Sequence, residues 1–108
     1  MAKHNQDGST TVLFRDEGPK ARPIVTAVFP CDPGSPGTMS CYQHIGQHSA
    51  CTTGWYRTTR PATEEEYLPL LHELVDYGPR GAKPYAKLRI VSRITSDMEE
   101  VRRTAELA

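Results

Sequence analysis

The sequence predicts a single α+β domain in which one main helix packs across an antiparallel sheet of about four strands. Three observations support this prediction: β-branched and aromatic runs bounded by turn residues, one amphipathic segment with a helix-capping signal, and a late segment of alternating apolar and charged residues. A chain of 108 residues has the size of one domain. The expected order is β-β-β-α-β-α, with a short C-terminal helix.

Two strands are expected near the start of the domain. Residues 1–10 are polar without a period, so they are expected to be a flexible leader before a domain that spans 11–108. Residues 11–15 are β-branched and aromatic, and 24–29 are apolar almost throughout, as in a strand buried on both faces. Pro30 is expected to end the second strand, because a loop rich in proline and glycine begins there.

The next part of the chain carries a weaker pattern. A third strand is expected over 38–45, where alternation would place Cys41 and Tyr42 on opposite faces. Residues 46–62 have no period and are expected to be a loop, with a short strand around 55–57 as the one element considered there.

The clearest element is a helix after Thr63. Thr63 and Glu66 form a capping-box pattern, in which the hydroxyl and the carboxylate each accept an amide hydrogen bond at the helix start. Pro69 would be the sixth helical residue and would cost about 3 kcal/mol there, so a bend or an irregular first turn is expected. Gly78 and Pro79 would end the helix. One apolar stripe would face the core: Tyr67, Leu70, Leu71, Leu74 and Val75.

The end of the chain predicts a strand and a second helix. Residues 86–95 alternate, so that one set would face inward (Leu88, Ile90 and Ile94) and another outward (Lys87, Arg89 and Arg93). Ser96 and Glu99 form another capping-box pattern. The helix after them has a thin apolar stripe, so it must dock on the domain, join a homodimer or fray; the stripe consists of Met98, Val101 and Ala105.

Charge and cysteine content exclude several classes. Thirteen Lys and Arg balance thirteen Asp and Glu, so no overall field would hold nucleic acid or an anionic membrane. No apolar stretch is long enough to cross a bilayer, and no secretion signal is recognised. Three cysteines do not suit a secreted disulfide scaffold, so thiols or metal ligands are expected. These features predict a cytoplasmic protein without a membrane partner.

The segment from Cys41 to Cys51 is the strongest candidate for a site. The spacing Cys41-x2-His44-x3-His48-x2-Cys51 supplies four residues of the types that bind zinc. On one continuous helix the two cysteines would stand about 15 Å apart, and zinc fingers separate their ligand pairs by many more residues. Ile45 also stands where a zinc-protease helix has its catalytic Glu. No cofactor is therefore expected, with zinc as the weaker alternative.

Two interpretations of the histidines stay open. As an acid/base pair, His44 and His48 would flank a ligand that Tyr42 or Gln47 orients, for example in phosphodiester hydrolysis. As structural residues they would belong to a turn at Gly46, with the cysteines as small core residues. The structural interpretation is favoured, because a His pair near a turn is a weak signal.

The segments 12–15, 42–48 and 60–67 carry a resemblance to a known group. They read Val-Leu-Phe-Arg, Tyr-Gln-His-Ile-Gly-Gln-His and Arg-Pro-Ala-Thr-Glu-Glu-Glu-Tyr. In this order they resemble a group of small bacterial and phage- or plasmid-borne proteins of unknown function, over roughly residues 12–94. The resemblance implies no activity. It implies that His44, Gln47 and His48 matter more than the flanking cysteines.

A second candidate surface is basic and aromatic. Arginines with neighbouring aromatic rings can stack bases and contact phosphate, as Trp55, Tyr56, Arg57 and Arg60 could. A second basic set lies on the last strand and its approach: Arg80, Lys83, Lys87, Arg89 and Arg93. The zero net charge favours a solvated outer face over nucleic-acid binding.

The absence of a recognisable catalytic set favours a small cytosolic binding or accessory protein that presents a surface to another macromolecule. An origin in a mobile element agrees with the resemblance. The alternatives are a metal-binding or acid/base enzyme centred on His44 and His48, and a nucleic-acid-binding module on the basic face.

Overall fold

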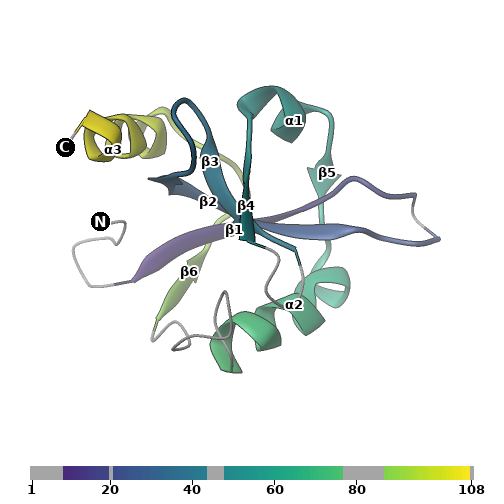
Figure 1. Cartoon of the computed structure of the whole chain (residues 1–108). Helices are drawn as coiled ribbons and strands as arrows, with labels where there is room; N and C mark the ends of the chain where they lie inside the picture. Colours follow the sequence, from purple (N-terminus) through teal and green to yellow (C-terminus); the bar gives the residue numbers. More distant parts are fainter. Residues whose placement is uncertain (1–8, 20, 44–47, 77–86, 108) are drawn as a thin grey trace.

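The computed structural model describes residues 9–19, 21–43, 48–76 and 87–107, with His48 described by its backbone alone. These residues form a six-stranded sheet with three helices (Figure 1). The strands are β1 (Thr10–Asp16), β2 (Val25–Pro33), β3 (Met39–Tyr42), β4 (His48–Cys51), β5 (Arg60–Pro61) and β6 (Leu88–Ile90), and the helices are α1 (Thr53–Arg57), α2 (Glu64–Asp76) and α3 (Ser96–Leu107). No helix in these ranges is long and apolar enough to cross a membrane.

The strand order confirms the α+β class and corrects the strand count. Neighbours along β4-β3-β2-β1-β5 pair antiparallel, as predicted. The described residues form six strands, where about four were expected. The strand β6 pairs in parallel with Thr10–Val12 of β1. Because β6 follows α2, the chain returns to β1 by a crossover, which is the connection that parallel pairing requires. β1 begins at Thr10, so the last residue of the expected leader belongs to the sheet.

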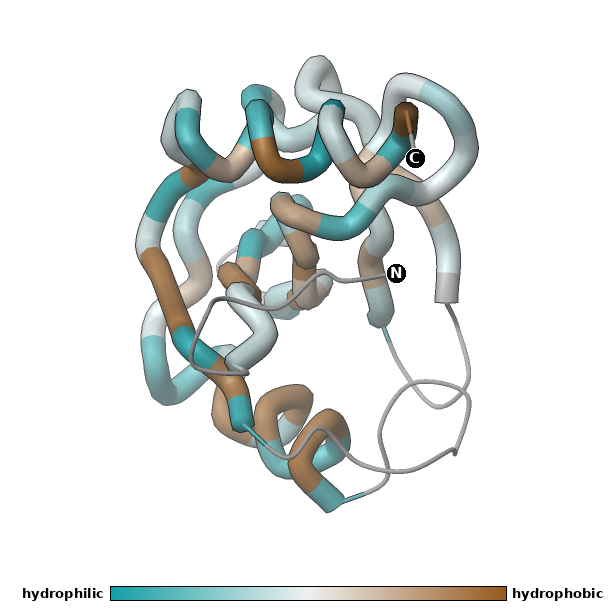
Figure 2. The backbone as a smooth tube through the Cα atoms, turned by 90° about the vertical axis from the view of Figure 1, so that its left-hand side faces the viewer, coloured by the Kyte–Doolittle hydropathy of each residue, from teal (hydrophilic) through white to brown (hydrophobic). Residues whose placement is uncertain are grey.

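The sheet buries an apolar cluster on each face. The cluster under α2 contains Val12, Phe14, Ala27, Phe29, Tyr42, Leu70 and Leu74. The cluster on the other face contains Leu13, Val28, Met39, Cys41 and Cys51, with Trp55, Tyr56, Val91 and Ile94 packed against it. In Figure 2, α2 lies at the bottom with several apolar (brown) positions, whereas α3 runs along the top and is mainly polar. Tyr42 belongs to the first cluster and Cys41 to the second, so the predicted placement of these residues on opposite faces is confirmed.

Helix α2 begins with the predicted capping box. The amide of Thr63 donates to Glu66 Oε1 at 2.9 Å, and the amide of Glu66 donates to Thr63 Oγ1 at 3.3 Å. Leu70 and Leu74 of the predicted stripe are buried, but Val75 is 45% exposed. Pro69 lies inside the continuous helix on its exposed side. The predicted stop at Gly78 and Pro79 lies outside the described residues.

The prediction of a loop over 46–62 is wrong, because three elements lie within this range. β4 and β5 lie within it, and the short strand expected around 55–57 is instead the helix α1. Thr52 caps α1, because its hydroxyl accepts from the amide of Trp55 at 3.0 Å. β4 has the sequence His-Ser-Ala-Cys, which has low strand propensity, so its pairing with β3 determines its conformation.

The strand β2 does not end at Pro30. It continues to Pro33 through an irregularity between Phe29 and Pro33 in its pairing with β3, where bulges accommodate residues that cannot donate to the ladder. The carbonyl of Pro30 accepts a hydrogen bond of 3.0 Å from Arg102 of α3. The strand expected to stop at a proline therefore continues and forms the surface on which α3 packs.

The C-terminal elements differ from their predicted limits. The strand expected over 86–95 covers only 88–90, because the chain bends at residues 92–93 toward α3, and Ile90 is 42% exposed. Thr95, not Ser96, caps α3, since its hydroxyl accepts from the amide of Met98 at 3.3 Å. Of the three outcomes expected for this helix, docking on the domain is observed, because α3 packs on β2. Val101 remains exposed, and a homodimer through the α3 stripe stays a prediction.

Candidate functional site

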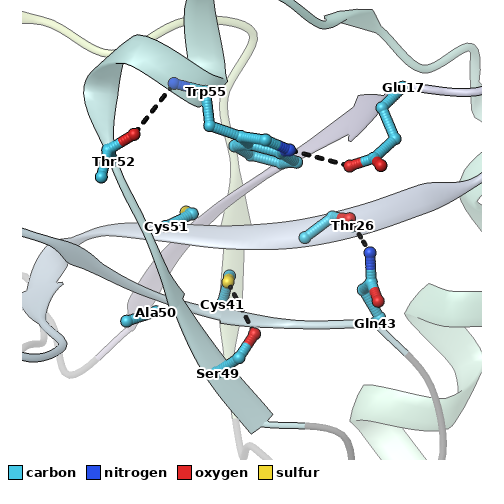
Figure 3. A pocket seen from close by; sticks show the side chains of 9 residues that line it. All are labelled: Glu17, Thr26, Cys41, Gln43, Ser49, Ala50, Cys51, Thr52 and Trp55. Carbon is cyan, nitrogen blue, oxygen red and sulfur yellow. Dashed lines mark hydrogen bonds between the residues drawn. The ribbon is translucent and has the colours of Figure 1, made fainter.

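A pocket of about 270 Å³ opens between the end of β1, the β3–β4 pair and α1 (Figure 3). We call it the Trp55 pocket. Its lining has one carboxylate, one indole, two thiols and a rim of hydroxyl and amide groups, all labelled in Figure 3. The lining includes no Lys, Arg or His from the part of the chain that the structure describes.

Trp55 is held in place at both of its nitrogen atoms. Its amide donates to the Thr52 hydroxyl at the start of α1, and its indole Nε1 donates to Glu17 Oε1 at 2.8 Å. Glu17 directly follows β1, so this bond connects segments 38 residues apart. The indole and a carboxylate therefore stand side by side at the mouth of the pocket, as Figure 3 shows.

The rim carries uncharged polar groups. Gln43 Nε2 donates to Thr26 Oγ1 at 3.0 Å, which fixes the amide of Gln43 at the end of β3. Ser49 and Thr52 contribute hydroxyl groups from β4 and from the residue after it. A ligand would therefore find hydrogen-bond donors and acceptors around one acidic group.

Two thiols form the floor of the pocket. In the β3–β4 pair Cys41 is opposite Ser49 and Cys51 is opposite Met39, so the cysteines lie diagonally on one face of the sheet. Both are free, with 3% and 7% of their surface exposed. Cys41 Sγ lies 3.3 Å from Ser49 Oγ, the contact drawn in Figure 3.

The two thiols differ in acidity. Hydrogen bonds from Cys51 and Ser49 stabilise the thiolate of Cys41 and lower its pKa to about 7, although burial acts in the opposite direction. The pKa of Cys51 is raised, because it is the hydrogen-bond partner of Cys41 and is itself buried. The pair therefore ionises at Cys41 first, and Cys51 retains its proton.

No match identifies this arrangement. No protein-family model, curated protein or solved structure matches the chain. The resemblance noted in the sequence therefore stays a prediction.

The structure brings together only part of the predicted site. Cys41 and Cys51 are neighbours, whereas His44 and Gln47 lie outside the described residues. The backbone of His48 pairs with Tyr42. Tyr42 belongs to the core under α2, where its hydroxyl donates to Glu73, so it does not line the Trp55 pocket. Within the described ranges no three residues of the types His, Cys, Asp and Glu are placed to hold a metal ion.

Part of the predicted basic and aromatic surface is engaged in internal contacts, namely Trp55, Tyr56 and Arg60. The guanidinium of Arg15 stacks on Tyr56, with Cζ 4.3 Å from the ring centroid. Arg60 pairs with Asp16 at 2.5 Å and with Glu66 at 2.9 Å. Arg57, Arg89 and Arg93 remain exposed. Arg80 and Lys83 lie outside the described residues.

Sequence reasoning missed the pocket residues Glu17, Thr26, Ser49 and Thr52. Glu17 and Thr26 are separated in sequence from the candidate segment and join it only through the sheet. The juxtaposition of the cysteines was missed because the expected third strand ran on to residue 45, which leaves no room for a hairpin. The structural interpretation of the histidines already places a turn at Gly46, but the residues after it have no strand pattern that would indicate β4.

Proposed function

We propose that the chain is a small cytosolic binding protein that uses the Trp55 pocket to hold a basic side chain of a protein partner. One observation carries this proposal: the Glu17 carboxylate and the Trp55 indole are fixed side by side over an open pocket with no basic residue in its described lining. A cation gains from the carboxylate and from the face of the indole ring.

The charge of the pocket favours a cation over an anion. Glu17 places a carboxylate at the mouth of the pocket, and the lowered pKa of Cys41, about 7, adds partial negative charge at the floor. A phosphate group would be repelled by both. This argues against nucleic-acid binding at Trp55, although the aromatic ring alone would suit a base.

The size of the pocket favours one side chain over a whole ligand. A volume of about 270 Å³ is below the usual range for drug-sized ligands, roughly 300–1,000 Å³. The adjacent strand β4 offers a way to anchor the rest of a peptide, because it is the last strand on its side of the sheet among the described residues. Ser49 and Ala50 are exposed there, and the strand carries no proline, Lys, Arg, Asp or Glu that would protect the edge.

An extended peptide that adds to the edge of β4 would point alternate side chains to opposite faces of the sheet. One of them would lie on the face of Ser49 and Cys51, which line the pocket. The proposed partner therefore presents an extended segment with a Lys or Arg at that position.

A selection from a random peptide library on the immobilised protein tests this proposal. Enriched peptides should contain a basic residue at one fixed position and should change the fluorescence of Trp55, the only tryptophan in the chain. Ala50→Lys should abolish binding, because a lysine on an edge strand opposes strand addition. Thr104→Lys on the exposed side of α3 is the matched control and should bind normally. Enrichment of acidic peptides, or equal binding by both variants, would overturn the proposal.

A further inference from the structure

We infer that Cys41 and Cys51 are a peroxide-reactive pair, in which a hydroperoxide oxidises Cys41 to a sulfenic acid and Cys51 then closes a disulfide across β3 and β4. This reaction uses the floor of the Trp55 pocket but does not depend on the proposed peptide partner. It would take place with the pocket empty.

The geometry brings both sulfur atoms to one place. Cys41 and Cys51 occupy diagonal positions on the same face of the β3–β4 pair, and the Cys51 thiol is close enough to lower the pKa of Cys41. Both line the same pocket as free cysteines. A resolving thiol therefore lies on the same face of the hairpin as the sulfur that would be oxidised, one diagonal position away.

The low exposure of the two thiols favours a small oxidant. Less than a tenth of each cysteine is exposed, so bulky reagents are hindered, but the open pocket above them has room for water and therefore for hydrogen peroxide. The third cysteine, Cys31, is buried and does not line this pocket. Burial raises the pKa of its thiol, which makes it less reactive than Cys41.

The two thiols are suited to different steps. The nucleophile must be a thiolate, and the hydrogen bonds from Cys51 and Ser49 favour ionisation at Cys41. Cys51 keeps its proton until Cys41 is oxidised. Reactive cysteines of redox sensors combine an acidic thiol with an adjacent resolving thiol in this way.

The reaction balances with one peroxide molecule. The Cys41 thiolate attacks one peroxide oxygen, the O–O bond breaks, and the departing hydroxide takes up a proton to become water. Cys51 sulfur then attacks Cys41 sulfur; the S–S bond forms, the S–O bond breaks, and hydroxide leaves with the Cys51 proton as a second water. Two thiols lose two electrons in total, and the peroxide accepts them.

Strain should make the product easy to reduce. Diagonal neighbours in an antiparallel pair have Cα atoms about 7–8 Å apart, whereas disulfides usually require about 4.4–6.8 Å. The hairpin must therefore shift to close the bond. Strained disulfides are reduced readily by small thiols, so glutathione should restore the pair.

Mass spectrometry of the reduced full-length protein after one equivalent of hydrogen peroxide tests the inference. The wild type should lose two hydrogen atoms, with fragmentation linking Cys41 to Cys51, and glutathione should reverse the change. Cys31→Ala should react like the wild type. Cys51→Ser should gain one oxygen on Cys41, trapped as a sulfenic acid by a cyclic 1,3-diketone, and Cys41→Ser should remain unmodified.

Circular dichroism of each variant confirms that it is folded before the reaction. An unfolded Cys41→Ser protein would be replaced by Cys41→Ala, for which the same absence of reaction is expected. Oxygen uptake by the wild type without loss of two hydrogen atoms, a disulfide that involves Cys31, or equal oxidation of folded Cys41 variants would overturn the inference.

Discussion

Trp55 Nε1 donates a hydrogen bond of 2.8 Å to Glu17 Oε1, which joins α1 to the end of β1. Glu17→Gln keeps an oxygen acceptor for the indole and removes the negative charge. We expect affinity for a basic peptide selected on the wild type to fall about tenfold, which corresponds to about 1.4 kcal/mol. Titration monitored by Trp55 fluorescence measures this change. Glu65→Gln, on the exposed side of α2, is the matched control and should bind normally.

The reactivity of Cys41 should depend on pH in a defined direction. Because its pKa is lowered to about 7, the thiolate is lost as the pH falls through 7, and the alkylation rate should fall with it. Two charged groups of the described residues act near the pair: Glu17, which lines the pocket, and Arg102, whose positive charge acts on Cys51. Alkylation by iodoacetamide, followed by mass spectrometry from pH 5 to 10, measures the midpoint.

Variants of the neighbouring groups should move this midpoint upward. Cys51→Ala removes the largest stabilising hydrogen bond and should shift the midpoint most, whereas Ser49→Ala should shift it less. Cys31 is the internal control, because burial raises the pKa of its thiol. A midpoint in the wild type that coincides with the ordinary thiol value would contradict the prediction.

Asp16 should contribute strongly to stability. Only 1% of its surface is exposed, and its carboxylate accepts from the amides of Gly18 at 2.8 Å and Ile24 at 2.9 Å and from Arg60 at 2.5 Å. Asp16→Ala leaves these donors without their acceptor, so we expect a loss of about 3 kcal/mol in the free energy of unfolding. Urea denaturation followed by circular dichroism measures it.

The exposed ion pair of Arg103 with Glu100 supplies the control for that prediction. Glu100→Ala should change the free energy of unfolding by less than about 1 kcal/mol, since solvent screens surface pairs. Equal losses in the two variants would refute the role given to the burial of Asp16.

Short-range patterns in the sequence predicted the helix α2, whose capping bonds join residues close in sequence. The α2 capping box and the buried Leu70 and Leu74 follow from residue spacing alone, and the structure contains them. The strands β4 and β5 could not be predicted in this way, because their residues have no strand pattern and their conformation depends on pairing with β3 and β1. The parallel pairing of β6 likewise depends on a crossover between distant segments.

The sequence predicted the segment that contains part of the candidate site, but not most of the residues that line the pocket. The segment from Cys41 to Cys51 does contain the two thiols of the pocket, yet a helical or straight-strand geometry separates them, and only the hairpin pairing makes them neighbours. Glu17 and Trp55 are separated by 38 residues, so no local spacing could reveal their contact. Residues joined across a sheet are recognised only when the strand order is known.

The cap of α3 gives a final prediction, because two adjacent residues are candidates. The capping-box spacing favours Ser96, whereas the structure has the Thr95 hydroxyl accept from the amide of Met98 at 3.3 Å. Thr95→Ala should lower the free energy of unfolding by about 1 kcal/mol, and Ser96→Ala should leave it almost unchanged. Thermal unfolding of both variants measures the difference, with Thr63→Ala, which removes the α2 cap, as the reference for a true cap. A larger loss for Ser96→Ala than for Thr95→Ala would move the start of α3 by one residue and contradict the observed cap.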